Sequence, residues 1–116
     1  SVPANIVTKD DFIIISGTTP IVAIGGMVQI TWTPQELGVS NPKNELIVVN
    51  VAQDRNNGYV WGNGYGNVNS GASTYKNSLP KVTTTPNSAY GTFFNESENS
   101  SRAIDYIVVF MKLALN

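Results

Sequence analysis

Short apolar stretches separated by polar turn residues recur along the whole chain, with little helical periodicity. The β-branched run Phe12–Ser16 is bounded by acidic residues on one side and Gly17 on the other, a pattern typical of a strand. Gly25-Gly26 indicates a hairpin-type turn. Such closely spaced punctuation predicts a protein built from short strands.

The stretch Met27–Trp32 alternates between two kinds of side chain. Alternation with a period of two places every second residue of a strand on the same face. Val28, Ile30 and Trp32 therefore define the expected core face of this strand.

Only one helix start is expected from the sequence, at Thr33. Thr33 is suited to cap a helix, Pro34 suits its first position, and Glu36 stands where a capping box requires it. Gly38 follows almost at once, so we expect at most one short helical turn near 33–38.

Further strands are expected at 59–61, Lys81–Thr85 and Ala89–Phe94. The run Glu45–Ala52 is apolar on both faces over 46–49, which favours burial on both sides. Residues 95–101 are polar throughout and predict an exposed loop.

The terminal run Ile104–Leu115 is also apolar on both faces. A strand of this kind is either central in a sheet or pressed against another subunit. At its start, Asp105 is expected to pair with Arg102 or to cap a turn.

Seven to nine short strands predict an all-β protein, an antiparallel, jelly-roll-like β-sandwich. A chain of 116 residues suits one domain, 1–116.

Neutral polar side chains dominate the surface chemistry. The chain has 14 Asn, 10 Ser and 10 Thr, but only 7 Lys and Arg against 8 Asp and Glu, with net charge −1. Without a basic run, release of counterions from nucleic acid has little to act on, so no nucleic-acid partner is expected. Such a surface favours binding by directional hydrogen bonds.

Cys and His are both absent, which removes thiol nucleophiles, the usual general base and the usual zinc ligands. We expect no cofactor and no bound metal. The stretch after Asp54 resembles the start of a calcium loop, but Tyr59 and Tyr65 occupy the places that require Gly and Glu.

No stretch has the pattern of a signal peptide or a membrane span. This favours a cytoplasmic or particle-associated protein without membrane insertion.

The segment Gly58–Asn67 places Trp and Tyr among Gly and Asn. Flat rings can meet the apolar face of a sugar, while amide and carboxylate groups bind its hydroxyls. The predicted ligand-binding residues are Asp54, Asn56, Asn57, Tyr59, Trp61, Asn63 and Tyr65. In the alternative interpretation Tyr59 and Trp61 pack in the core, and Val60 is exposed.

Three functions compete on this sequence. The first is a non-enzymatic, lectin-like carbohydrate-binding protein, made multivalent by self-association as a homodimer or homotrimer through the 104–115 strand. The second is a receptor-binding attachment tip or another particle protein of a virus or phage. The third is a small glycan-cleaving enzyme, which the scattered acids and the missing His disfavour. We therefore expect a glycan-binding protein with no catalytic residues.

Overall fold

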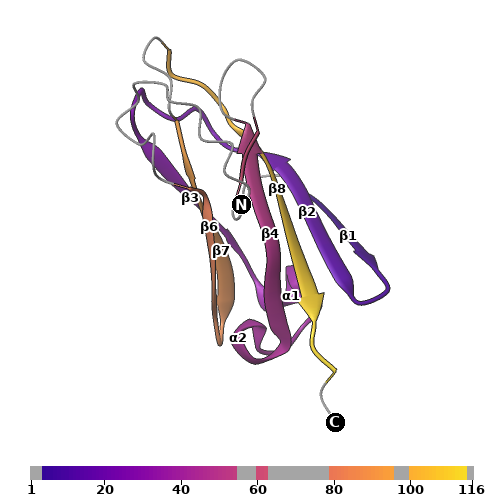
Figure 1. Ribbon diagram of the computed structural model, residues 1–116. Helices are drawn as coiled ribbons and strands as arrows, with labels where there is room; N and C mark the ends of the chain where they lie inside the picture. Colours follow the sequence, from indigo (N-terminus) through magenta and orange to yellow (C-terminus); the bar gives the residue numbers. More distant parts are fainter. Residues whose placement is uncertain (1–3, 55–59, 63–78, 96–99, 115–116) are drawn as a thin grey trace.

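Two antiparallel sheets form the protein, as the computed structural model shows for residues 4–54, 60–62, 79–95 and 100–114 (Figure 1). The five-stranded sheet has the order β1-β2-β8-β4-β5 and the three-stranded sheet the order β3-β7-β6. Their elements are β1 (Ala4–Lys9), β2 (Phe12–Thr18), β3 (Met27–Trp32), α1 (Pro34–Leu37), α2 (Pro42–Glu45), β4 (Leu46–Asp54), β5 (Val60–Gly62), β6 (Lys81–Thr85), β7 (Ser88–Phe94) and β8 (Asp105–Lys112). The predicted β-sandwich is confirmed.

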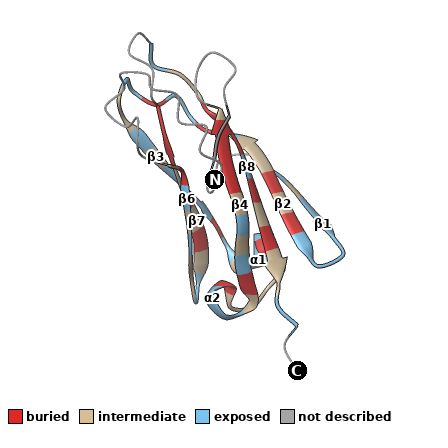
Figure 2. Cartoon of the chain, viewed as in Figure 1, coloured by how far each residue is buried: buried red, intermediate tan, exposed pale blue. Residues whose placement is uncertain are grey.

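The core lies between the two sheets, where buried positions alternate along the strands (Figure 2). In β3, Ile30 and Trp32 are buried and Val28 is half-buried, so the predicted core face is confirmed. The five-stranded sheet contributes Ile13, Ile15, Val51, Tyr106, Val108 and Phe110, and the three-stranded sheet adds Ala89 and Phe93. Burial of these apolar side chains is the main force that holds the sheets together.

Two helical turns, not one, join β3 to β4. In α1, Thr33 accepts a hydrogen bond from the Glu36 N–H, and the Glu36 carboxylate accepts one from the Thr33 N–H. The predicted capping box is thus confirmed, and Gly38 ends the turn with φ 73°. The second turn, α2, begins after Asn41, whose side chain accepts from the Asn44 N–H. It corrects our expectation of a single turn, because Asn-Pro repeats the cap-and-proline start seen at α1.

β8 is the central strand of the five-stranded sheet, between β2 and β4. One of the two interpretations of the terminal run is therefore confirmed. The neighbouring strand β4 departs from expectation, because Ile47 is 45% exposed and Val49 is 49% exposed. Burial on both sides is thus wrong for this strand within one chain, since only its inner face meets the second sheet.

The segments before and after β2 pair differently from what the sequence predicted. A strand that the sequence did not predict, β1, pairs with β2 over its whole length, and Asp10 adopts φ 54° in the turn between them. Gly25 does form a tight turn with φ 69°, as expected. No hairpin results, because Val22 bridges to Arg102 while β3 pairs with β7.

Tyr106 and Trp32 bring two polar atoms into the core. The rings of Tyr106 and Phe93 are stacked with centroids 4.5 Å apart, and Trp32 lies 6.1 Å from Tyr106. Neither the Tyr106 hydroxyl nor the Trp32 indole nitrogen makes a hydrogen bond of normal geometry. Burial raises the pKa of Tyr106 above its ordinary value of 10.0, and the nearby indole N–H opposes that rise only in part.

We expect this phenol to make the protein less stable in alkali. Above pH 10 the unfolded chain releases the Tyr106 proton while the folded chain retains it, because its pKa is raised. The free energy of unfolding then falls with pH, by up to about 1.4 kcal/mol per pH unit for this one proton. Urea titrations between pH 8 and pH 11 should show a shallower fall for Tyr106→Phe than for the wild type. Tyr90→Phe, at a half-buried position, serves as the control; equal slopes for the two variants would contradict the prediction.

Candidate functional site

One end of the sandwich, here called the loop end, gathers the strand ends that carry the predicted site. β2, β4 and β7 finish at this end, and β3 and β8 begin there. The two helical turns lie at the opposite end (Figure 1). Sites on loops are precise only when a rigid scaffold holds the loop stems, so the bonds among these strand ends decide what the loop end can do.

Gln53 fastens the two sheets together at the loop end. Its side chain is 1% exposed, and its Oε1 accepts a hydrogen bond of 2.9 Å from the Phe94 N–H. Its Nε2 donates to the Phe94 carbonyl at 2.7 Å and to the Asp54 carbonyl at 3.2 Å. β6 begins opposite Thr92, two residues before Phe94, so the amide of Gln53 continues the pairing of β7 beyond the start of β6.

Asn95 is a second buried amide at this end. Its Nδ2 donates to the Val22 carbonyl at 2.9 Å and to the Ser100 carbonyl at 3.1 Å, and its backbone N–H donates to Gly26. Asn95 is 1% exposed, so our expectation of an exposed loop is wrong for this residue. Its amide can be buried because it donates to these two backbone carbonyls.

The segment after β2 is tied to the segment before β8. Val22 and Arg102 exchange two backbone hydrogen bonds, of 2.9 and 3.1 Å. Thr19 donates its N–H to the Ile104 carbonyl, and its hydroxyl accepts from the Ile104 N–H at 3.0 Å. We call this set of hydrogen bonds the polar frame. It consists of the bonds made by the side chains of Gln53 and Asn95, the Val22–Arg102 backbone pair and the Thr19–Ile104 pair.

Asp54 and Arg102 form an ion pair at the rim of the polar frame. Their side chains are 29% and 28% exposed, so solvent reaches both. Asp105, the partner that we expected for Arg102, instead accepts a hydrogen bond of 2.6 Å from the Thr18 hydroxyl. That expectation is corrected: the guanidinium reaches across to the end of β4, where it fixes the orientation of the Asp54 carboxylate.

The structure places part of the predicted site. Asp54 ends β4, and Trp61 occupies the middle of the edge strand β5, where its backbone is in register with Gln53. The side chain of Trp61 lies outside the described part, as do five further predicted residues, Asn56, Asn57, Tyr59, Asn63 and Tyr65. The sequence did not predict the partners of Gln53, Asn95 and Arg102, which lie 41, 73 and 48 residues away. No local pattern marks such distant pairing.

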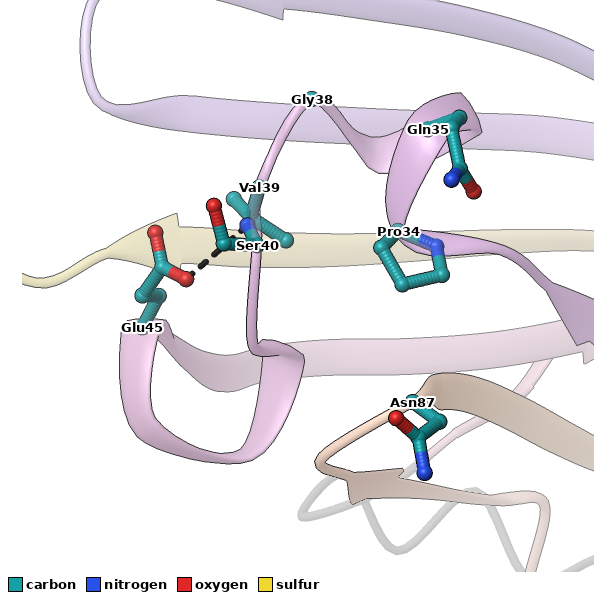
Figure 3. A pocket seen from close by; sticks show the side chains of 7 residues that line it. All are labelled: Pro34, Gln35, Gly38, Val39, Ser40, Glu45 and Asn87. Carbon is teal, nitrogen blue, oxygen red and sulfur yellow. Dashed lines mark hydrogen bonds between the residues drawn. The ribbon is translucent and has the colours of Figure 1, made fainter.

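A hollow of about 600 Å³ lies at the end of the sandwich opposite the loop end, between the helical turns and the β6–β7 turn (Figure 3). It is lined by Pro34, Gln35, Gly38, Val39, Ser40, Glu45 and Asn87. The only carboxylate in this lining, that of Glu45, accepts hydrogen bonds from the N–H groups of Ser40 and Asn41. Glu45 therefore holds the segment before α2 in place. The hollow contains none of the predicted ligand-binding residues.

Within the described ranges, no group of three or more His, Cys, Asp or Glu side chains is placed to hold a metal ion. Among the same residues, no helix has the length and apolar character needed to cross a membrane.

Comparison with known proteins returned no similarity for this chain: no protein-family model matches it, and neither does any curated protein or solved structure.

Proposed function

We propose that this protein is a non-enzymatic, lectin-like carbohydrate-binding protein whose ligand contacts the loop end. The observation that carries the proposal is the Asp54–Arg102 ion pair, which is held by the polar frame and still reached by solvent. Sugar hydroxyls both donate and accept hydrogen bonds, so a fixed carboxylate beside a fixed guanidinium offers them an acceptor and a donor together.

The polar frame supports this function because it restricts the conformations of the strand ends at the loop end before a ligand binds. Binding a polar ligand by hydrogen bonds is more favourable when the protein groups are ordered in advance, because less conformational entropy is then lost. Gln53 and Asn95 supply that order without exposing their own amides. The neutral composition of the chain, with 14 Asn, agrees with recognition by hydrogen bonds rather than by net charge.

The proposal excludes turnover at this pair. Glycoside hydrolysis requires two carboxyl groups facing each other across the scissile bond. At the loop end the Asp54 carboxylate is paired with the Arg102 guanidinium, so its partner is not a second carboxyl group. Multivalent presentation by self-association belongs to the same proposal, because single sugar sites are weak.

Trp61→Ala is the test of the proposed site. We expect it to weaken binding to a responsive glycan at least tenfold, because a stacked ring is lost, while the melting temperature changes little. Tyr90→Ala, on the outer face of β7, is the matched aromatic control and should bind as the wild type does. A glycan array identifies the ligand, and titration calorimetry measures the affinities. The absence of binding to every glycan, or a large fall in melting temperature without a loss of affinity for Trp61→Ala, would overturn the proposal.

Fluorescence gives an independent reading of the same residue. The chain contains two Trp residues, and Trp32 is 1% exposed in the core. In the variant Trp32→Phe, all indole emission comes from Trp61. We expect emission typical of a solvated indole that shifts to shorter wavelength when the glycan is added; emission of a buried indole without ligand would favour the core interpretation of Trp61.

A further inference from the structure

The two outer faces of the sandwich differ in chemistry. On the three-stranded sheet, the exposed side carries Gln29, Thr31 and Thr83, which are polar and suit contact with water, and Met27 at the start of β3. On the five-stranded sheet, the side turned away from the core is mostly apolar, and it carries Phe12, Ile14, Ile47, Ile107, Val109 and Met111, with Ser16 and Asn50 as polar residues among them. We call this second surface the outer face. Antiparallel sheets that meet water on one side normally alternate apolar-in and polar-out, and the outer face breaks that rule.

Strand register makes the outer face continuous. Phe12 is opposite Met111, and Met111 is opposite Ile47, which gives one apolar row across three strands. The next row joins Val7 to Ile14 and Val109, and ends at the polar residue Asn50 on β4. Directly opposite residues in antiparallel strands have their Cβ atoms only about 5 Å apart, so these rows form one patch and not scattered exposed residues.

From this surface we infer that the outer face packs against the outer face of a second copy, as a face-to-face homodimer. The inference deepens the self-association in the proposed function and rests on that part of it, but it does not depend on glycan binding. Among the residues that the structure describes, the interior of the outer face carries no charged side chain; Lys9 and Asp105 lie only at its margins. A partner of the same uncharged and largely apolar character is therefore complementary to it, and another copy has that character by symmetry.

The size of the outer face fits a dimer. The strands β1, β2, β8 and β4 have six to nine residues each, and at about 4.8 Å between strands and 3.4 Å per residue they span roughly 20 by 25 Å. That is about 500 Å² in projection, before side-chain relief is counted, against about 800 Å² per partner in a standard stable interface. Two sheets packed face to face at about −30° bury most of such a surface.

The test measures mass and interface in the same full-length chain. Multi-angle light scattering should give the wild type twice the 12.5 kDa chain mass. Ile107→Lys and Ile47→Lys should each weaken association at least about 30-fold, because a two-fold interface buries every introduced charge twice. Ile24→Lys, at an exposed apolar residue off this face, is the matched control and should remain dimeric. Circular dichroism confirms that each variant folds.

Cysteine labelling keeps the inference testable if a lysine variant fails to fold. The chain has no Cys, so a maleimide reports one introduced site. Labelling of Ile47→Cys should slow severalfold as protein concentration rises, while labelling of Ile24→Cys should not change.

A monomeric wild type, a mass of three chains, or equal labelling of the two sites would overturn the inference. Binding of a monomer to phospholipid vesicles would assign the outer face to a membrane instead. Glycan binding by a monomer would remove this inference alone, and a dimer that binds no glycan would remove only the proposed site.

Discussion

Replacing Gln53 with Leu is expected to lower the free energy of unfolding by about 3–5 kcal/mol, because a buried donor and acceptor on β7 lose their bonds together. Leu is close in volume to Gln, so the change removes hydrogen bonds more than it removes packing. The amide makes three of them, two to the Phe94 backbone and one to the Asp54 carbonyl. No water is at hand to replace them, since the side chain is 1% exposed.

Gln29→Leu is the matched control for this substitution. Gln29 also lies on a strand, but its side chain is exposed, and a surface substitution of this kind changes stability by about 0.5 kcal/mol or less. Guanidinium denaturation of the two variants compares them directly. A loss below about 1 kcal/mol for Gln53→Leu would mean that the link between the sheets contributes little. Because Gln53 adjoins Asp54, the same variant should also weaken any glycan binding at the loop end.

Local patterns in the sequence were sufficient where one strand or turn determines its own structure. The alternation in 27–32 gave the correct inner face of β3, and the Thr33–Glu36 spacing gave the capping box of α1. β1 escaped prediction because its residues are mostly exposed, so pairing with β2 stabilises it rather than burial. The turn at Gly25 was recognised, but its flanking segments join different partners, and strand pairing over long distances has no local signature.

The candidate site divides along the same line. Asp54 was predicted from its neighbourhood to aromatic and amide residues, and it does occupy the loop end. The polar frame behind it was not predicted. Asn95 lies in a polar stretch that resembles a solvent-exposed loop. Its side chain can be buried because it donates a hydrogen bond to the distant Val22 carbonyl. A buried amide and an exposed amide look alike in one sequence; the difference lies in partners brought together by the fold.

Strands that are apolar on both faces carry information that one chain does not explain. The sequence led us to expect that β4 is covered on both sides, and β8 has the same composition. The second sheet covers only their inner sides, which leaves Ile47 and Ile107 at 45% and 39% exposure. If a second copy covers the outer face, the same residues satisfy the expectation in the assembly. The apolar pattern would then record association as well as folding.

Gly91→Val is expected to destabilise the protein by about 3 kcal/mol, since an oversized side chain in a packed core forces its neighbours from their rotamers. Core rings lie close to the β7 backbone at Gly91. A Cβ atom there would lie 2.9 Å from two ring atoms of Phe93 and 3.1 Å from the Trp32 ring. Both rings are buried, at 0% and 1% exposure, so they have little room to move.

A double-mutant cycle separates this steric clash from a general effect of changing a strand residue. Phe93→Leu removes the ring edge that the new side chain would meet, and by itself it should cost about 1–2 kcal/mol through lost burial. In Gly91→Val with Phe93→Leu, the loss in unfolding free energy should be at least 1 kcal/mol smaller than the sum of the single losses, as expected for residues in contact. Thr92→Val, one residue further on the outer side of β7, should change stability by less than about 0.5 kcal/mol. Strict additivity of the two core substitutions would show that the cost of Gly91→Val does not arise from contact with Phe93.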